Sequence, residues 1–439
     1  MLWKTLYNAL VIPALTVGFY TAARFSPKIR AGLAGRRSVF DSIEAQLGSA
    51  RELSQTAWFH FTSVGEFEQV KPLIEAFKDD VRIVLTYFSP SVHPNVSNYP
   101  HHDAAIYLPL DTSRNAKRLF QIIRPSLLVF SKFDIWPNLV WHAAKYKVPI
   151  ALIAGTLQPK SKRLASFARP FFREVHRHIS VHCVISEDDA QRFRMICPPS
   201  TQIEVTGDTR FDRVYQRAVT VNGETEIFPG QSTLERPILI AGSTYLEEER
   251  VVLEAYRRLR EKASHNPDCN SLPHLILVPH EPAAERIDEI QTQLDHLDFS
   301  RVCFSELQKG VNLSETDVII IDTIGLLAQL YRLGDVAFVG GSFHGSVHNV
   351  MEPAAMAKPI LFGPTIHNAY EAGILKARGA AQLVNNAEEM AEALTSLLSD
   401  TAKRTRMGQI GKQVIKENLG ASERTLAHIK SHLTIYSEF

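Results

Sequence analysis

A glutamate follows a predicted strand and a glycine in the first half of the chain. Residues 57–64 (AWFHFTSV) predict a buried strand, the turn Ser63-Val64-Gly65 ends it, and a helical pattern opens at Glu66. A carboxylate at such a strand end suits a general base that removes a proton from an acceptor hydroxyl. The helix dipole alone also favours an acid at this position. From the residues alone, both interpretations of Glu66 stay open.

A second acid follows the predicted strand 126–131. Asp134 lies in a short polar run from Lys132 to Asn138 that also contains Trp136. Charged residues directly after a buried strand occupy the edge at which open α/β sheets hold their ligands. Asp134 is therefore a second catalytic candidate. The alternative is a solvated loop that the tryptophan packs against the domain.

The densest group of polar side chains lies between Val339 and Ala372. A glycine-rich loop after a strand lets the backbone approach a phosphate, and an acid further along can bind the hydroxyls of a ribose. Taken singly, His348 fits a surface histidine, and Glu352 fits an acid favoured at a helix start. Because both stand among glycines and strand ends, the segment predicts a ligand site. The strand end at 242–244 offers further backbone N–H groups to an anion.

Several classes of protein are disfavoured. None of the glycine turns matches the dinucleotide-binding fingerprint or the Walker phosphate loop, which argues against a dehydrogenase and a P-loop enzyme. A net charge of +1 leaves no excess of positive charge for nucleic acid. Four scattered cysteines show neither a metal-binding spacing nor a disulfide framework, so they predict idle thiols in a reducing compartment. No metal or other cofactor is expected.

Apolar, β-rich runs alternate with helical patterns, which predicts parallel sheets covered on both faces. The predicted strands are 57–64, 81–88, 126–131, 148–155 and 181–187, then 237–244, 274–280, 317–323, 335–342 and 358–364. A basic, aromatic segment at 160–179 is predicted to be helical. The fold class is therefore α/β, with two similar halves around one linker that imply a cleft between them, and with an N-terminal hydrophobic helix. The expected divisions are 1–36 (anchor and basic flank), 37–219 (first domain), 220–236 (linker), 237–418 (second domain) and 419–439 (a final helix).

The N-terminal segment carries a membrane signal. Residues 5–23 hold no charge over 19 positions, which as a helix is just long enough to cross ~30 Å of hydrocarbon. Basic residues follow this segment more than they precede it, which argues against a cleaved signal peptide and keeps the body in the cytoplasm. A helix that spans or lies on the membrane is expected. The alternative is a buried helix, which Asn8, Pro13 and Gly18 keep open.

Together these segments resemble the Kdo transferases, which move 3-deoxy-D-manno-octulosonic acid (Kdo) from CMP-Kdo to lipid A precursors. The resemblance covers nearly the whole chain and rests on an ordered set of motifs. The set is Ser63-Val64-Gly65-Glu66, Asp134-Ile135-Trp136-Pro137-Asn138, Gly207-Asp208-Thr209-Arg210-Phe211-Asp212, Ala241-Gly242-Ser243-Thr244 with Glu248, Asp322-Thr323-Ile324-Gly325, and Val339-Gly340-Gly341-Ser342 with His348-Asn349, Glu352-Pro353, Gly363-Pro364 and Asn368 to Glu371.

The resemblance implies a GT-B-type fold, in which two Rossmann-like domains face each other across a cleft. It also implies an inverting, metal-independent transfer without a cofactor. Glu66 matches the proposed catalytic base, and the final helix of such folds often crosses back to the first domain. The first domain, with its basic surface, would take the lipid A precursor at the cytoplasmic face of the bacterial inner membrane. The second would bind the CMP-Kdo donor. The donor-binding candidates are Gly242, Ser243, His280, Gly341, Ser342, Gly345, His348, Asn349, Glu352, Asn368 and Glu371.

Two positions depart from the pattern common in this family. Lys132 stands where many members carry an acid, so that Asp134 is the remaining candidate for a second catalytic carboxylate. His280-Glu281 stands where many members have Arg-His. The departures leave two alternatives open: another nucleotide-sugar transferase or epimerase, and a catalytically inactive membrane scaffold that binds a sugar nucleotide. A plain soluble α/β protein with a buried first helix is the third alternative.

Overall fold

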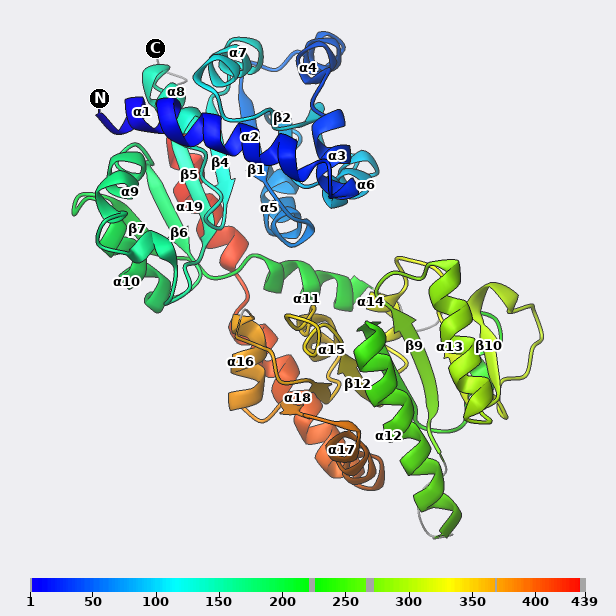
Figure 1. Ribbon diagram of the computed structural model, residues 1–439. Coiled ribbons are helices and arrows are strands. Elements are labelled where there is room, and N and C mark those ends of the chain that lie inside the picture. Colours follow the sequence, from blue (N-terminus) through cyan, green and yellow to red (C-terminus); the bar gives the residue numbers. More distant parts are fainter. Residues whose placement is uncertain (1, 221–225, 266–271, 368, 435–439) are drawn as a thin grey trace. The chain divides into compact units, whose positions relative to one another are not determined.

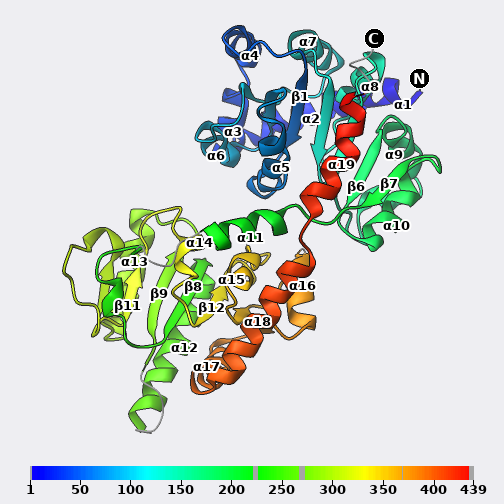
Figure 2. The same cartoon turned by 180° about the vertical axis from the view of Figure 1, so that it is seen from behind.

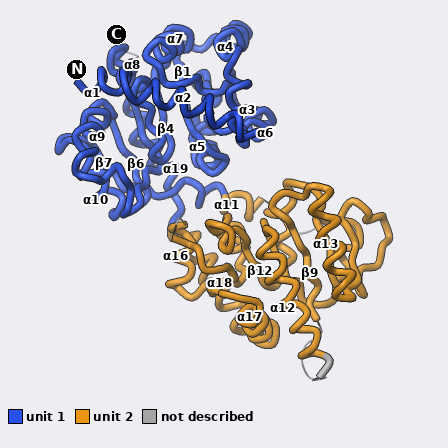
Figure 3. Tube along the Cα trace, in the orientation of Figure 1, with its two compact units in different colours: residues 1–213, 418–439 blue, residues 214–417 orange. Residues whose placement is uncertain are grey.

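The chain forms two compact units, one of residues Met1–Arg213 with Asn418–Phe439 and one of residues Val214–Glu417 (Figure 3). The computed structural model describes residues 2–220, 226–265, 272–367 and 369–434. Within these residues each unit is built on a seven-stranded sheet whose strand pairs are all parallel. The α/β class and the two Rossmann-like units predicted from the sequence are confirmed.

The first unit has the strand order β3-β2-β1-β4-β5-β6-β7. Its strands are β1 (Thr56–Phe61), β2 (Arg82–Tyr87), β3 (Ala104–Tyr107), β4 (Leu127–Ser131), β5 (Ile150–Gly155), β6 (Val181–Val184) and β7 (Gln202–Val205). Alternate residues of the central strands enter two different cores, since Trp58 and Phe130 pack on one face while Phe59 and Val129 pack on the other. Burial of both faces explains why these strands are continuous apolar runs.

Helices cover both faces of the first sheet. They are α3 (Pro27–Ala34), α4 (Val39–Gly48), α5 (Val64–Phe77), α6 (His93–Ser97), α7 (Ser113–Ile123), α8 (Pro137–Lys145), α9 (Arg169–His176), α10 (Glu187–Ile196) and α19 (Ala421–Thr434), while α11 (Arg210–Thr220) leads into the second unit. Ile429 of α19 packs in the same core as Phe67 of α5. The end of the chain therefore completes the first unit, as the red helix in Figure 2 shows.

The second unit has the strand order β10-β11-β9-β8-β12-β13-β14. Its strands are β8 (Ile238–Thr244), β9 (His274–Pro279), β10 (Arg301–Cys303), β11 (Val318–Ile320), β12 (Val336–Val339), β13 (Ile360–Phe362) and β14 (Ala381–Leu383). Its helices are α12 (Leu246–His265), α13 (Ala284–His296), α14 (Leu327–Leu330), α15 (Met351–Ala355), α16 (Tyr370–Ala377), α17 (Ala387–Ser399) and α18 (Thr401–Glu417). All ten predicted strands are present. The strands missed, β3, β7, β10 and β14, have three or four residues each and are too short to give a periodic signal.

The predicted helix at 160–179 is wrong over its first half. Only Arg169–His176 is α-helical, after a short 3₁₀ turn at Lys162–Leu164. Pro170 explains the start, because proline lacks the N–H that a preceding helix would need and fits the first turn of a new one.

The N-terminal residues form one long helix along the surface of the first unit (Figure 1). It comprises α1 (Leu2–Leu6), a π turn at Tyr7–Val11 and α2 (Ile12–Ala22). The π turn stands just before Pro13, which cannot donate an N–H to the preceding turn. In the described part of the chain, Leu2–Ala22 is the helix long and apolar enough to cross a membrane, and 11% of its apolar window is buried.

A buried polar cluster fixes this helix to the first unit. The Tyr7 hydroxyl donates to Asp111 Oδ2 at 2.9 Å, and the amides of Asn8 and Asn138 bond to each other at 3.0–3.1 Å. The Asn138 N–H also donates to Asp111. The tyrosine ring packs on Trp141 with centroids 5.6 Å apart. One stripe of the helix is thus held by protein.

The stability of this cluster should depend on pH. Burial raises the pKa of the Asp111 carboxyl to about 7 from 3.8, although bonds from Asn138 and Tyr7 oppose the rise. The folded state favours the protonated form of Asp111. The contribution of Asp111 to folding stability is therefore complete below pH 3.8 and is lost as the pH rises through about 7. We expect Asp111→Asn to match the wild type in thermal midpoint below about pH 3.8, to exceed it increasingly as the pH rises above that value, and to show the full difference near pH 8. Thermal unfolding of both proteins across this range is the check, and parallel midpoints at all pH values would contradict it.

Two glycines of α18 form a matched pair for testing helix packing in the second unit. A Cβ at Gly408 would lie 1.8 Å from the Ala357 carbonyl oxygen, whereas a Cβ at Gly411 would lie 3.5 Å from Ala354. We expect Gly408→Ala to lower the free energy of unfolding by about 1–3 kcal/mol, because α18 must move outward. Gly411→Ala should be neutral or slightly stabilising, since alanine favours helix by about 1 kcal/mol. Urea unfolding of the two variants is the test, and equal midpoints would contradict the close contact.

Candidate functional site

The predicted site residues lie where each sheet changes direction. In the first sheet the chain moves outward from β1 to β2 and β3, then resumes on the other side of β1 with β4. In the second sheet β8 has β9 on one side and β12 on the other. Ligands of open α/β sheets bind beyond the carboxyl ends of strands at such points. Glu66 and Asp134 follow β1 and β4, Ser243 is the last but one residue of β8, and Ser342 follows β12.

Glu66 is a buried acid at the start of α5, with 6% of its surface exposed. It forms a capping box with Ser63, whose hydroxyl accepts the Glu66 N–H at 3.3 Å. Its Oε2 accepts the N–H groups of Thr62 and Ser63 at 2.6 and 3.3 Å. Within the described residues its Oε1 has no hydrogen-bond partner. Helix capping therefore occupies one carboxylate oxygen and leaves the other for a proton.

The environment of Glu66 increases its basicity. Burial raises the pKa of this carboxyl above its usual range, and the nearby Asp134 carboxylate adds to the rise. The N–H groups of Thr62 and Ser63 and the charge of Lys132 act in the opposite direction. A base is most effective when its pKa approaches the working pH, so a raised value suits proton removal.

Asp134 belongs to the same cluster. Its Oδ2 accepts the hydroxyl of Thr62 in a short hydrogen bond and lies 3.6 Å from Nε2 of the buried His60. The indole N–H of Trp136 donates to the same His60 nitrogen at 2.9 Å. The tryptophan thus orients the histidine, and the threonine hydroxyl positions the aspartate. The structure brings Glu66 and Asp134 into one electrostatic neighbourhood.

The glycine loop after β12 is shaped by contacts that exclude side chains. Gly341 has φ +94°, and a Cβ there would lie 2.3 Å from the Ser346 carbonyl oxygen. A Cβ at Gly340 would lie 2.2 Å from the Ser243 carbonyl oxygen. The buried Ser342 hydroxyl accepts the Gly363 N–H at 2.6 Å. The loop is therefore held between the ends of β8 and β13.

Four rings stack beside this loop. His280 and His348 lie parallel with centroids 4.4 Å apart, and Tyr245 lies 4.5 Å from His344 and 4.9 Å from His280. Burial, with smaller effects from His280 and His344, lowers the pKa of His348 to about 4, so this ring is neutral at pH 7. Its Nε2 is buried without a hydrogen-bond partner in the described structure. A neutral ring with an unused nitrogen can donate a hydrogen bond to an anion.

Glu248 connects the turn after β8 to the glycine loop. This acid is fully buried, and its two oxygens accept the N–H groups of Tyr245 and Phe343, each at 2.9 Å. The bonds fix the loop relative to the start of α12.

The remaining donor-binding candidates have more ordinary surroundings. Gly242 lies within β8, where a Cβ would lie 2.4 Å from the Tyr331 hydroxyl, so packing alone requires glycine there. Gly345 has open space around it. Asn349 Oδ1 accepts the Met351 N–H at 3.1 Å, and Glu352 lies 3.8 Å from Arg217. Glu371 is buried at the start of α16, and Asn368 lies outside the described residues.

Sequence reasoning missed His60, Thr62, Tyr245 and His344. His60 and Thr62 lie within and just after a strand taken as plain core, so only the pairing of β1 with β4 reveals them. Tyr245 and His344 had a local signal, because each stands next to a glycine-containing strand end already singled out. In the described chain, neither cluster groups histidines, cysteines and acids at metal-ligand distances.

The chain is similar to several known proteins. Residues 37–213 match the family model for 3-deoxy-D-manno-octulosonic-acid transferase (kdotransferase). The 3-deoxy-D-manno-octulosonic acid transferase of Haemophilus influenzae is 26% identical, with 98% of this chain and 99% of that one covered. The enzyme of the same name from Chlamydophila psittaci is 28% identical, with 86% and 85% covered. MnaA of S. aureus, solved with UDP, shares the fold at a TM-score of 0.58 and 15% identity, with 88% and 98% covered.

The protein is a glycosyltransferase. This class follows from the two parallel α/β units, from the acids and the glycine loop at their switch points, and from the relatives named above. In sequence the chain is similar to the Kdo transferases, because their family model covers most of the first unit and their relatives align with both units. The resemblance drawn from the ordered motifs is confirmed.

Proposed function

We propose that this chain transfers Kdo from CMP-Kdo to a lipid A precursor with inversion at the anomeric carbon, in lipopolysaccharide biosynthesis. The observation that carries the mechanism is the state of Glu66: a buried acid at the sheet's switch point, with one oxygen unbonded and a raised pKa. Glu66 takes the proton of an acceptor hydroxyl, and the oxygen of this hydroxyl attacks the anomeric carbon of Kdo. The bond from this carbon to the CMP phosphate breaks, and CMP leaves as an anion. Asp134 assists because its negative charge favours the protonated form of Glu66 and so makes Glu66 a stronger base.

The second unit binds the donor. The N–H groups of the loop at Gly341 and Ser342 and the free nitrogen of His348 approach the phosphate, and they stabilise the charge that develops on departing CMP without a metal. Glu352, close to Arg217, binds the ribose hydroxyls.

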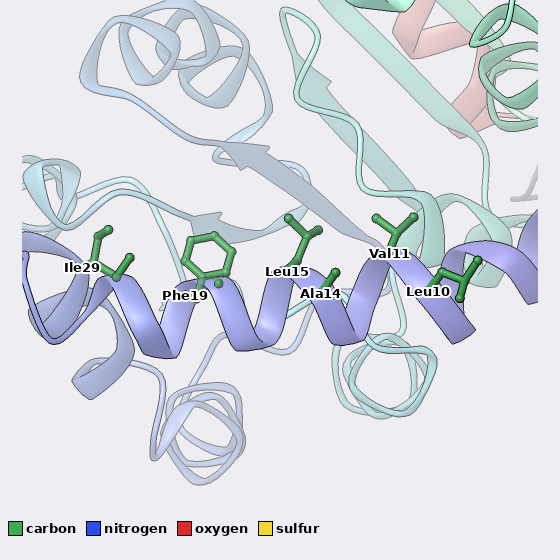
Figure 4. Close-up of a pocket in the computed structure, with 8 residues that line it drawn as sticks. Leu10, Val11, Ala14, Leu15, Phe19 and Ile29 are labelled. Atoms are coloured by element: carbon green, nitrogen blue, oxygen red, sulfur yellow. The ribbon is translucent and has the colours of Figure 1, made fainter.

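The N-terminal helix places the enzyme on the cytoplasmic face of the inner membrane. Its outward side is apolar, with Leu10 and Val17 63% and 66% exposed, and a shallow apolar groove of about 580 Å³ runs along it (Figure 4). Tyr7 and Asn8 tie the opposite stripe to the first unit. A helix held along its length by protein lies in the membrane interface with its apolar face in the lipid. Arg24, Lys28 and Arg30 follow it and attract anionic headgroups.

The membrane proposal predicts a loss of lipid binding in Val17→Glu. A carboxylate on the outward face opposes insertion, so we expect a several-fold lower fraction of protein floating with anionic vesicles. Ser49→Glu adds the same charge at another exposed position of the first unit and should float like the wild type. Equal flotation of the two variants would contradict the proposal that the outward face of the N-terminal helix inserts into the lipid.

Turnover tests the reaction itself. The detergent-solubilised chain is supplied with CMP-Kdo, generated in place, and a tetraacylated lipid A precursor. Acceptor-dependent CMP release, with a Kdo-modified lipid detected by mass, is the expected result. Donor binding without transfer would favour the inactive scaffold. Conversion of UDP-N-acetylglucosamine instead would favour the epimerase alternative.

A further inference from the structure

A closed cluster of two histidines and a cysteine lies inside the first unit, in a part of the fold that the proposed reaction does not use. His176 ends α9, His182 lies in β6, and Cys197 follows α10. Their exposed fractions are 2%, 0% and 1%. Side chains of three separate elements thus meet in one buried place.

The potential ligand atoms of the three side chains converge. His176 Nδ1 lies 2.8 Å from His182 Nε2, and Cys197 Sγ lies 3.6 Å from the same nitrogen. All three atoms lie within 4.8 Å of one another. Imidazole nitrogen and thiolate sulfur are the ligands that zinc and copper(I) prefer.

Hydrogen bonding alone satisfies this arrangement poorly. An imidazole nitrogen that accepts has a single lone pair, so His182 Nε2 cannot accept from both His176 and Cys197. If it donates instead, its single hydrogen serves His176 Nδ1, and the Cys197 sulfur gains no bond from this nitrogen. Buried polar groups are normally paired, and one central ion would satisfy all three atoms at once.

We propose that His176, His182 and Cys197 form a closed site for a thiophilic metal ion, zinc(II) or copper(I), which fastens α9 and α10 to β6. Metal–nitrogen and metal–sulfur bonds of ~2.0 and ~2.3 Å require the two imidazole nitrogens to move apart by only about 0.5 Å. The separation of sulfur from His182 Nε2 already fits.

The protonation and charge of the cluster agree with a metal site. Burial lowers the pKa of His182 to about 3 and that of His176 below its usual range, so both rings are neutral and able to ligate. Copper(I) with one thiolate is neutral, whereas zinc(II) with one thiolate keeps a positive charge near Arg163 and Arg173, which act on His176 and Cys197. Buried net charge is costly, which favours copper(I) unless zinc carries hydroxide as a fourth ligand.

The ion would stabilise the seat of the N-terminal helix. Phe171 of α9 packs against Tyr7 and Trp3 of that helix, with ring centroids 5.9 Å apart in both pairs. Fixing the end of α9 at His176 therefore fixes the surface on which the helix lies.

The test is the metal content of the full-length chain, purified in detergent without chelator from cells grown with added zinc or copper. We expect about one equivalent of one ion per chain by mass spectrometry, and its identity distinguishes zinc from copper. Cys197→Ala should lose most of it. Cys183→Ala is the matched control, because Cys183 is equally buried in β6 but lies outside the cluster, and it should keep the ion.

X-ray absorption of the wild type gives a measurement that does not depend on a folded variant. A metal shell with both sulfur and imidazole nitrogen supports the site, and a shell without sulfur overturns it. Equal metal content in the two cysteine variants also overturns it. A wild-type chain that is metal-free as purified, and retains neither ion after refolding with zinc(II) or anaerobic copper(I), does the same.

Discussion

Glu66→Gln lowers the turnover of CMP-Kdo by about a thousandfold, the range of effects found when a general base is removed. The substitution separates the two roles of this residue. Glutamine keeps an oxygen that can accept the N–H groups of Thr62 and Ser63, so the capping box survives. It loses the basicity that burial and Asp134 confer on the acid. Activity should therefore fall while the thermal midpoint stays close to that of the wild type.

The pH profile provides the mechanistic readout. Only the deprotonated Glu66 carboxylate can take the proton from the hydroxyl of the acceptor substrate. The kcat/KM of the wild type should therefore rise with pH through the raised pKa of Glu66. The residual activity of Glu66→Gln should lack this limb.

Glu306→Gln is the matched control for the glutamate substitution. Glu306 caps a short 3₁₀ turn in the second unit and accepts the Cys303 N–H at 2.9 Å, so the same chemical change is made at the same kind of cap. It should leave turnover unchanged. Substantial activity in Glu66→Gln, or an equal loss in Glu306→Gln, would remove Glu66 from the mechanism.

Gly341→Ala weakens CMP binding by at least about tenfold. Alanine at φ +94° is strained, and its Cβ meets the Ser346 carbonyl oxygen at 2.3 Å and the His348 ring at 2.8 Å. A non-glycine residue held in such a region costs about 1–3 kcal/mol, and loop displacement relieves it. Displacement moves the backbone N–H groups and the His348 ring together, so the phosphate loses several partners at once. Titration calorimetry with CMP gives the affinity without requiring turnover.

Gly345→Ala separates strain from a general intolerance of the loop. A Cβ at Gly345 meets nothing within 4 Å, so alanine should bind CMP within about threefold of the wild type, an energy difference of roughly 0.6 kcal/mol. A comparable loss of affinity in both glycine variants would mean that the loop responds to any substitution. Unchanged affinity in Gly341→Ala would exclude this loop from the donor site.

The sequence by itself determined the fold class and the strand ends at which two candidate clusters lie, one around Glu66 and one around His348. Continuous apolar strands can be buried only in sheets covered on both faces, and polar residues directly after them must collect at the carboxyl edge. Glu66, Asp134, Ser342 and His348 were found in this way, because strand-end chemistry is local in the chain.

Only the tertiary structure decided which side chains complete each cluster. His60 approaches Asp134 because β1 pairs with β4, although the two residues are 74 positions apart. Tyr245, His280 and His344 stack because β8 lies between β9 and β12, an order that local periodicity does not encode. The meeting of His176, His182 and Cys197 likewise depends on how α9 and α10 pack on β6. Periodicity reports which face of a segment is buried, whereas strand order and helix packing, which are set by the whole core, determine which buried and strand-end residues meet.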